Sequence, residues 1–198
     1  IYTLDKPSKD VNDWVLHFRY TQNDSIHNSN LSKFTMPVSE QSIVGNVVIH
    51  KQAINIPDLY ALSEDRSLNP FGVKHDKSWD QRLGYESRSM LSLPVFNIAH
   101  EVTGIIQLIN RKKDPERKLL SPVDFQENVI PFDNRDIEYG LIVGQQAGIA
   151  LENAAMTEEI QTLFDGFVNA AVTAIDMRAT SAMPRPEAPP IEFKADHP

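Results

Sequence analysis

Two runs of apolar, β-favouring residues form the clearest pattern in the sequence. They span Met90–Phe96 and Val102–Ile109, and the polar residues 97–101 lie between them. Runs of strand length joined by a short polar turn predict an antiparallel hairpin. Both runs are largely apolar rather than strictly alternating, so we expect the hairpin to lie in the centre of a sheet.

The rest of the chain before residue 90 has weaker patterns. Short runs of β-favouring residues predict strands at residues 1–4, 14–20, 34–38 and 53–56. Residues 39–48 open a helix, for which Ser39 is the expected N-cap. Residues 58–88 have little periodicity, and so long an irregular stretch within a compact domain is usually functional. Residues 113–128 carry charges of both signs and are expected to form an exposed insertion.

A long helical pattern runs from Asp133 to about Arg178, with Asp133 as its cap and Asp136 near the positive end of the helix dipole. Apolar and small residues recur along it at spacings of four and three, namely Ile137, Leu141, Gly144, Gly148, Leu151 and Ala155, then Ile160, Leu163, Phe164, Phe167, Ala171 and Ile175. Because this helix outruns one domain, its apolar face needs a partner. We expect a homodimer through the 133-178 helix, and the alternative is a break near Gly166 with the helix folded back.

The order of several short motifs resembles that of a GAF domain. The motifs are QNDS (residues 22–25), SEQSIVGNVV (39–48), AINIPDLY (53–60), DQRLGYESR (80–88) and the hairpin. Asn110-Arg111, followed by Phe132 and Asp136, resembles the family's Asn-Lys…Phe-x-x-x-Asp-Glu pattern, with Arg in place of Lys and Ile137 where Glu is expected. The resemblance implies an α+β fold: a central antiparallel sheet of five or six strands with helices packed on it, and a long C-terminal signalling helix. Residues 58–88 would form a lid over a ligand pocket.

The resemblance is closest to the GAF domains that precede HD-GYP phosphohydrolase modules in bacterial signalling proteins. Residues 164–178, FDGFVNAAVTAIDMR, resemble the helix that leads into such a module, and no His-Asp pair or Gly-Tyr-Pro follows them. The resemblance implies a sensory domain at residues 1-155. A helical linker and dimerisation segment at 156-178 would lead to an absent output module, and a Pro-rich irregular tail would follow at 179-198. The parent protein would be a cyclic-di-GMP phosphodiesterase, whereas this chain would be regulatory and not an enzyme. The alternative is a ligand-free dimerisation module with a degenerate pocket.

The resemblance also implies a set of ligand-binding residues. Relatives place pocket-lining residues at the positions of Asp80, Tyr85, Ser87, Arg88 and Ser89. These side chains suit a cyclic nucleotide or another small polar ligand, and no cofactor is certain. The alternative is that Arg88 is solvated and Tyr85 covers the edge of the core.

Two further groups of residues have two interpretations each. The residues Ser42 and Ile43 begin the short helix and could receive an anionic group, the alternative being ordinary capping. Asn110, Arg111, Phe132 and Asp136 are expected to act as a structural latch that ties the sheet to the helix, the alternative being direct ligand contact.

Composition narrows the function classes. The formal net charge of -8 and pI near 5.2 argue against nucleic-acid partners and against an anionic membrane surface. The sequence has no cysteine, no P-loop and no nucleophile motif, so nothing in it points to catalysis. No signal-peptide pattern follows Ile1, and a cytoplasmic location is expected. Among the six histidines, only His75 with Asp76 and Asp80 forms a cluster of metal-ligating types, and no metal site is expected.

Overall fold

The computed structural model describes residues 1–25, 34–62 and 69–181, without the side chains of Trp79 and residues 174–181. It divides into two compact units, Ile1–Asn153 and Ala154–Pro198. Most of the predicted tail, from residue 182 onward, lies outside the described residues.

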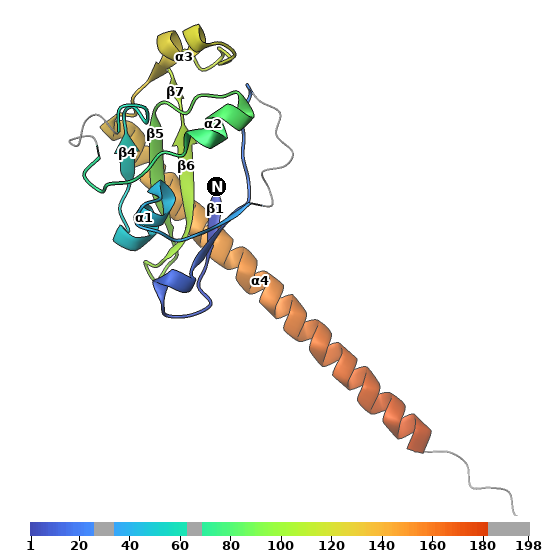
Figure 1. Ribbon diagram of the computed structural model, residues 1–198. Helices are drawn as coiled ribbons and strands as arrows, with labels where there is room; N and C mark the ends of the chain where they lie inside the picture. The colour runs from blue at the N-terminus through green and yellow to red at the C-terminus, as the bar shows by residue number, and fades with distance from the viewer. Residues whose placement is uncertain (26–33, 63–68, 182–198) are drawn as a thin grey trace, which may run out of the picture. The chain divides into compact units, whose positions relative to one another are not determined.

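The first unit is built on a six-stranded antiparallel sheet, which confirms the predicted α+β fold (Figure 1). The strands are β1 (Tyr2–Asp5), β2 (Val15–Phe18), β3 (Thr35–Pro37), β4 (Ile54–Ile56), β5 (Met90–Phe96) and β6 (Val102–Ile109), in the order β3-β2-β1-β6-β5-β4. The other elements are η1 (Val11–Asp13), α1 (Ile43–His50), α2 (Lys77–Leu83), α3 (Pro122–Asn128), α4 (Asn134–Ser181) and a two-stranded sheet of β7 (Arg111–Lys112) and β8 (Val129–Ile130). The predicted hairpin is β5 and β6, and it is central, as expected.

Alternation along the hairpin separates the two faces of the sheet. Met90 and Ile105 belong to a buried core that includes the apolar side chains of α1. Leu93 points to the opposite face, where α4 lies against it at Gly140. The pocket described below lies on the α1 side, so the sheet separates the pocket from the long helix.

Helix α1 begins three residues later than predicted. Ser39 does not cap it: the Ser39 carbonyl accepts a hydrogen bond from the Ser42 amide at 3.1 Å, which closes a turn before the helix. Ser42 is the N-cap, and its hydroxyl accepts from the Gly45 amide at 3.0 Å. The turn folds so tightly that a β-carbon at Gly45 would overlap with Ser39 and Ser42. The glycine therefore fixes the position of the cap.

Two short helices were missed where the sequence has little periodicity. Helix α2 lies within residues 58–88, between the Asp76 cap and Gly84 in the left-handed conformation. Helix α3 lies within residues 113–128, which are not simply an exposed insertion because Leu119 and Phe125 are buried there. Each helix has seven residues, too few to show a convincing 3.6-residue period.

Helix α4 continues through Gly166 without a break, which contradicts the fold-back alternative. Within the first unit its packed face contains Gly140, Gly144 and Gly148, which lie against Leu93, Pro94 and Phe96 of β5. The predicted apolar stripe is therefore only partly right, because Leu141 and Leu151 are exposed. None of the helices within the described ranges combines the length and the apolar character needed to cross a membrane.

Candidate functional site

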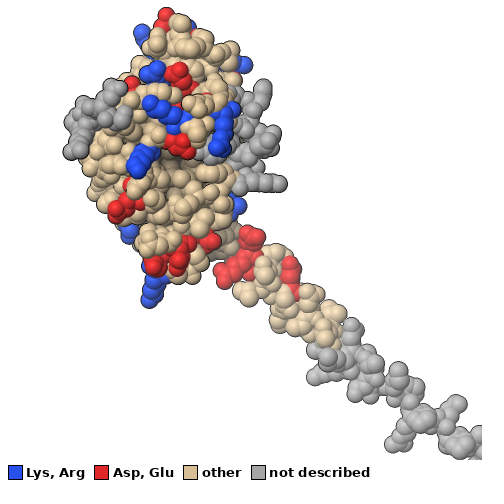
Figure 2. Space-filling model, in the orientation of Figure 1, with Lys and Arg blue, Asp and Glu red and all other residues tan. Residues whose placement is uncertain are grey.

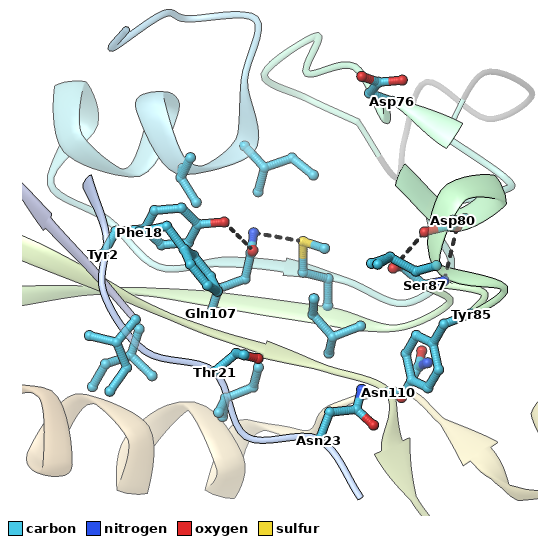
Figure 3. A pocket seen from close by; sticks show the side chains of 18 of the residues that line it. Tyr2, Phe18, Thr21, Asn23, Asp76, Asp80, Tyr85, Ser87, Gln107 and Asn110 are labelled. Carbon is cyan, nitrogen blue, oxygen red and sulfur yellow. Dashed lines mark hydrogen bonds between the residues drawn. The ribbon is translucent and has the colours of Figure 1, made fainter. Parts of the chain in front are cut away.

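A cavity of about 1020 Å³ opens on the α1 side of the sheet. Its walls come from β1, β2, β3, β5 and β6, from the first turn of α1, and from the segment that contains α2. Figure 3 shows an aromatic end with Tyr2 and Phe18 and a polar end with Asp80, Ser87, Tyr85 and Asn110. This volume is at the upper end of the range for small-molecule sites.

Asp80 organises the polar end of the cavity. Its buried carboxylate accepts hydrogen bonds from the Ser87 amide at 3.0 Å, the Ser87 hydroxyl at 2.8 Å and the Tyr60 hydroxyl at 3.0 Å. His75 Nε2 lies 3.2 Å from the same carboxylate. Helix α2 carries Asp80, so these bonds hold the helix against the segment that enters β5.

The surroundings of Asp80 determine its charge state. Burial alone would raise its pKa, but the bonds from His75, Ser87 and Tyr60 together outweigh burial and lower the pKa of Asp80 below its ordinary value. Burial first, and then the bond to Asp80, raise the pKa of Tyr60 to about 12. At neutral pH the carboxylate is therefore ionised and Tyr60 remains a hydrogen-bond donor.

The Ser87, Asp80 and His75 side chains do not form a nucleophilic triad. In such a triad the histidine lies next to the serine and takes its proton. Here the Ser87 hydroxyl donates to Asp80, whose lowered pKa makes it a poor base. These contacts position the loop rather than activate the serine.

Asn110 fixes the segment that enters β5. It has a left-handed backbone with φ of 60°, a conformation that asparagine tolerates better than most residues. Its side-chain oxygen accepts from the Arg88 amide at 2.7 Å, and its side-chain nitrogen donates to the Glu86 carbonyl at 2.7 Å. Asn110 therefore ties the end of β6 to residues 86–88. This segment includes Ser87, which donates to Asp80.

Arg111 connects the sheet to the start of α4. Its guanidinium lies 2.9 Å from Asp136, 2.9 Å from Asp133 and 3.1 Å from the Pro131 carbonyl. Asp133 and Asp136 also cap α4 reciprocally through each other's backbone amides. Because the Arg111 and Asp136 side chains are 30% and 27% exposed, their pairing contributes at most about 1 kcal/mol and mainly sets geometry. Phe132 joins the arrangement through its carbonyl, which accepts from Asn55 at 3.0 Å.

The structure brings most of the predicted ligand-binding residues to the cavity. The predicted residues that line it are Ser42, Ile43, Asp80, Tyr85 and Ser87. Arg88 lies outside, where it contacts Asp58 and Glu86 and covers the ring of Tyr60 at 4.9 Å. Ser89 is buried beneath, and its hydroxyl accepts from the Arg111 amide at 3.1 Å.

Several lining residues were missed by the sequence analysis. Four of them are aromatic, namely Tyr2, Phe18, Tyr20 and Phe34. Gln107, in the middle of the cavity, was also missed, although a glutamine within an apolar central strand was a visible signal. Tyr85 also packs edge-on against Phe125 of α3 at 5.2 Å, so α3 supports the pocket wall.

Charge around the pocket differs from that of the chain as a whole. The cavity lining includes the cations Lys74, Arg82 and Arg111 and the anions Asp76 and Asp80. The chain as a whole has 19 cationic and 27 acidic residues, so the lining is less acidic than the rest. On the face shown in Figure 2, Lys and Arg side chains lie among Asp and Glu side chains. Among the described residues, no three His, Asp or Glu side chains gather as metal ligands.

A family model described as the GAF domain matches residues 11–151, which are more than half of the chain. The chain belongs to the GAF domain family. GAF domains are generally regulatory rather than catalytic and often bind small ligands. The match begins at η1 and ends within the part of α4 that packs on the sheet. It therefore covers all the residues that line the cavity except those before residue 11.

A curated relative of this GAF domain is named dual 3′,5′-cyclic-AMP and -GMP phosphodiesterase 11A, from Takifugu rubripes. It is 32% identical over 76 residues, which are 38% of this chain and 7% of that protein. The matched part is therefore a small fraction of the relative.

Proposed function

We propose that this GAF domain senses a small polar ligand in the cavity and controls an output module through α4. The observation that carries the proposal is the cavity itself, about 1020 Å³ in volume and bounded by an aromatic end and a polar end. A cyclic nucleotide has the matching chemistry, a flat base and a charged phosphate, and the relative's name refers to cyclic AMP and cyclic GMP. The alternative, a ligand-free interaction module, would be better supported by a cavity filled with side chains.

A thermal-shift panel with cyclic AMP, cyclic GMP, cyclic-di-GMP, GTP and common metabolites tests this proposal. We expect one compound at about 100 times its dissociation constant to stabilise the protein by about 2.7 kcal/mol. For a chain of this size the corresponding rise in melting temperature is roughly 5–10 °C.

A matched pair of variants shows whether the shift comes from the cavity. Thr21 is exposed and lines the cavity, so Thr21→Trp should reduce the shift without unfolding the domain. Thr162→Trp, on the exposed surface of α4, should leave the shift unchanged. A flat panel would favour the ligand-free module, whereas equal shifts in both variants would mean that the ligand binds outside the cavity.

We also propose that two copies of the chain pair through the 133-178 helix, as the length of α4 suggests. In the second unit the side chains of Ile160, Leu163 and Phe167 are 66%, 68% and 71% exposed. Their spacing of three and four places them on one face, where a second helix would cover them.

Sedimentation velocity tests the pairing of α4. The wild-type chain should sediment as a dimer, whereas Leu163→Glu should place a charge in the interface and give monomers. Gln161→Glu adds the same charge two residues away, outside the apolar face, and should remain dimeric. A monomeric wild-type chain would contradict the pairing.

The identity of the output module is a separate proposal. The sequence of residues 164–178 supports an HD-GYP cyclic-di-GMP phosphodiesterase in the parent protein, as set out above. An assay of cyclic-di-GMP hydrolysis by the full-length protein tests it. Hydrolysis by the full-length protein but not by this chain is the expected result, and no hydrolysis by either would contradict it.

A further inference from the structure

The side-chain amide of Gln107 lies in the middle of the cavity, between its aromatic and polar ends (Figure 3). It projects from β6, where Gln107 pairs with Ser92 of β5. The polar groups of Asp80, Ser87 and Asn110 are already held by strong hydrogen bonds within the protein. The amide of Gln107, in contrast, makes only long or weak contacts.

The contacts of Gln107 fix the orientation of its amide. Nε2 lies 3.1 Å from the Met90 sulfur and 3.3 Å from the Ser92 hydroxyl oxygen. A thioether sulfur has no hydrogen and can only accept, so the nitrogen of the amide must face Met90. Both hydrogens of Nε2 are used in this way, and the carbonyl oxygen Oε1 faces Tyr2.

The carbonyl of Gln107 is held weakly. The Tyr2 hydroxyl donates to Oε1 at 3.4 Å, well beyond the usual 2.7–2.8 Å for a hydroxyl donor. Burial raises the pKa of Tyr2 to about 12, so the phenol keeps its proton at neutral pH. Tyr2 is the one partner that the described part of the chain provides for this oxygen. The second lone pair of Oε1 is therefore available to a ligand.

The aromatic side chains that line the cavity suggest a flat ligand group. The Tyr2 and Phe18 rings meet edge to face at 5.2 Å, and Tyr20, Phe34 and Phe132 also line the cavity. Aromatic walls of this kind favour flat, apolar rings. A hydrogen-bond donor on the edge of such a ring would pair with the Gln107 carbonyl.

We propose that Gln107 determines ligand specificity by accepting a hydrogen bond from an N–H on the edge of a flat aromatic ring. This inference rests on the proposed function, because it requires that the cavity binds a ligand. The middle of the cavity should therefore bind a heterocycle that has a ring N–H more tightly than a ring of the same shape that lacks one.

Indole and benzofuran test the preference directly, because they have the same shape and differ in the ring N–H. Their binding to the complete chain is measured by titration with amide-resolved NMR. We expect indole to bind the wild type about three- to tenfold more tightly than benzofuran, as one additional hydrogen bond would give. In Gln107→Met, which keeps the length of the side chain but removes the acceptor, the two fragments should bind equally.

Two further variants separate specificity from a merely structural role. In Tyr2→Phe the Gln107 carbonyl loses its hydroxyl partner, so the preference for indole should increase above that of the wild type. Gln145→Met, at an exposed position of α4, should leave the preference unchanged. A structural role for Gln107 would predict no increase in Tyr2→Phe, and this variant decides the question if Gln107→Met does not fold.

The outcomes distinguish this inference from the proposed function. If both fragments bind the wild type equally, or the preference persists in Gln107→Met, the role of Gln107 is wrong and the cavity remains a ligand site. If neither fragment shifts the resonances of cavity residues, the cavity does not bind flat rings and this inference is wrong, whereas the proposed function is contradicted only by a flat thermal-shift panel.

Discussion

Replacing Asp80 with alanine should lower the free energy of unfolding by about 3 kcal/mol, because several buried donors lose their acceptor at once. Ser87 donates twice to this carboxylate, and Tyr60 and His75 contact it as well. The expected loss corresponds to a decrease in melting temperature of roughly 6–12 °C for a chain of this size. Urea denaturation followed by circular dichroism measures it.

Asp76 provides the matched control for Asp80, four residues earlier in the sequence. It is exposed and caps α2 by accepting from the Ser78 amide at 3.0 Å. Asp76→Ala should therefore cost only about 1 kcal/mol, the usual effect of a lost cap. Equal losses in the two variants would show that Asp80 acts only through helix α2 and not through its buried partners.

The contribution of Asp80 should also depend on pH. Because its folded-state pKa is below the ordinary value of 3.8, its stabilisation is complete above pH 3.8 and is lost as the pH falls through the folded-state pKa. The difference in urea midpoint between wild type and Asp80→Ala should therefore stay constant above pH 3.8 and shrink as the pH falls below this value. A difference that stayed constant below pH 3.8 as well would mean that the carboxylate charge is not what stabilises the loop.

The sheet was predictable from sequence because its signals are local. The bounds of β5 and β6 follow from continuous apolar runs, and the polar turn between them is unambiguous. The contact between Arg111 and Asp136 could likewise be expected, because both residues lie at the ends of elements that were correctly predicted.

The missed features depend on tertiary contacts. Helix α2 is too short to show periodicity and is held by the bonds of Asp80 to residues outside the helix. Arg88 was expected in the pocket because relatives place pocket-lining residues at its position, but its side chain points away from the cavity, opposite to that of Ser87. Its guanidinium instead lies over Tyr60, which was not among the predicted residues. Gln107 could have been chosen from sequence, but only the fold places it next to Tyr2, 105 residues away.

Replacing Gly148 with alanine should lower the free energy of unfolding by about 2–3 kcal/mol, because α4 packs directly on the backbone of β5 at this position. A β-carbon at Gly148 would overlap with the carbonyl of Phe96 and touch Val95. Neither neighbour can move easily, since both belong to a central strand. The helix must therefore shift away from the sheet.

Gly166 is the matched control, since it lies in the same helix and a β-carbon there would meet no atom within 4 Å. Gly166→Ala should stabilise the helix by about 0.5–1 kcal/mol, the usual gain from removing a helical glycine. The two variants therefore carry the same chemical change, but one should lower the free energy of unfolding and the other should raise it. Urea denaturation measures both, and a stabilising effect at Gly148 would mean that α4 does not depend on close contact with β5.

Hydrogen exchange locates the effect of Gly148→Ala within the domain. The carboxylate of Glu152, one turn further along α4, accepts from the Ile98 amide at the tip of the hairpin at 3.1 Å. If alanine at position 148 lifts the helix from β5, this bond breaks and the Ile98 amide should exchange faster, while amides in β2 keep their protection. Faster exchange confined to this contact would show that Gly148 joins α4 to β5, a strand of the sheet that forms the pocket floor. A ligand that shifts β5 or β6 would then change the position of α4 through the same contact.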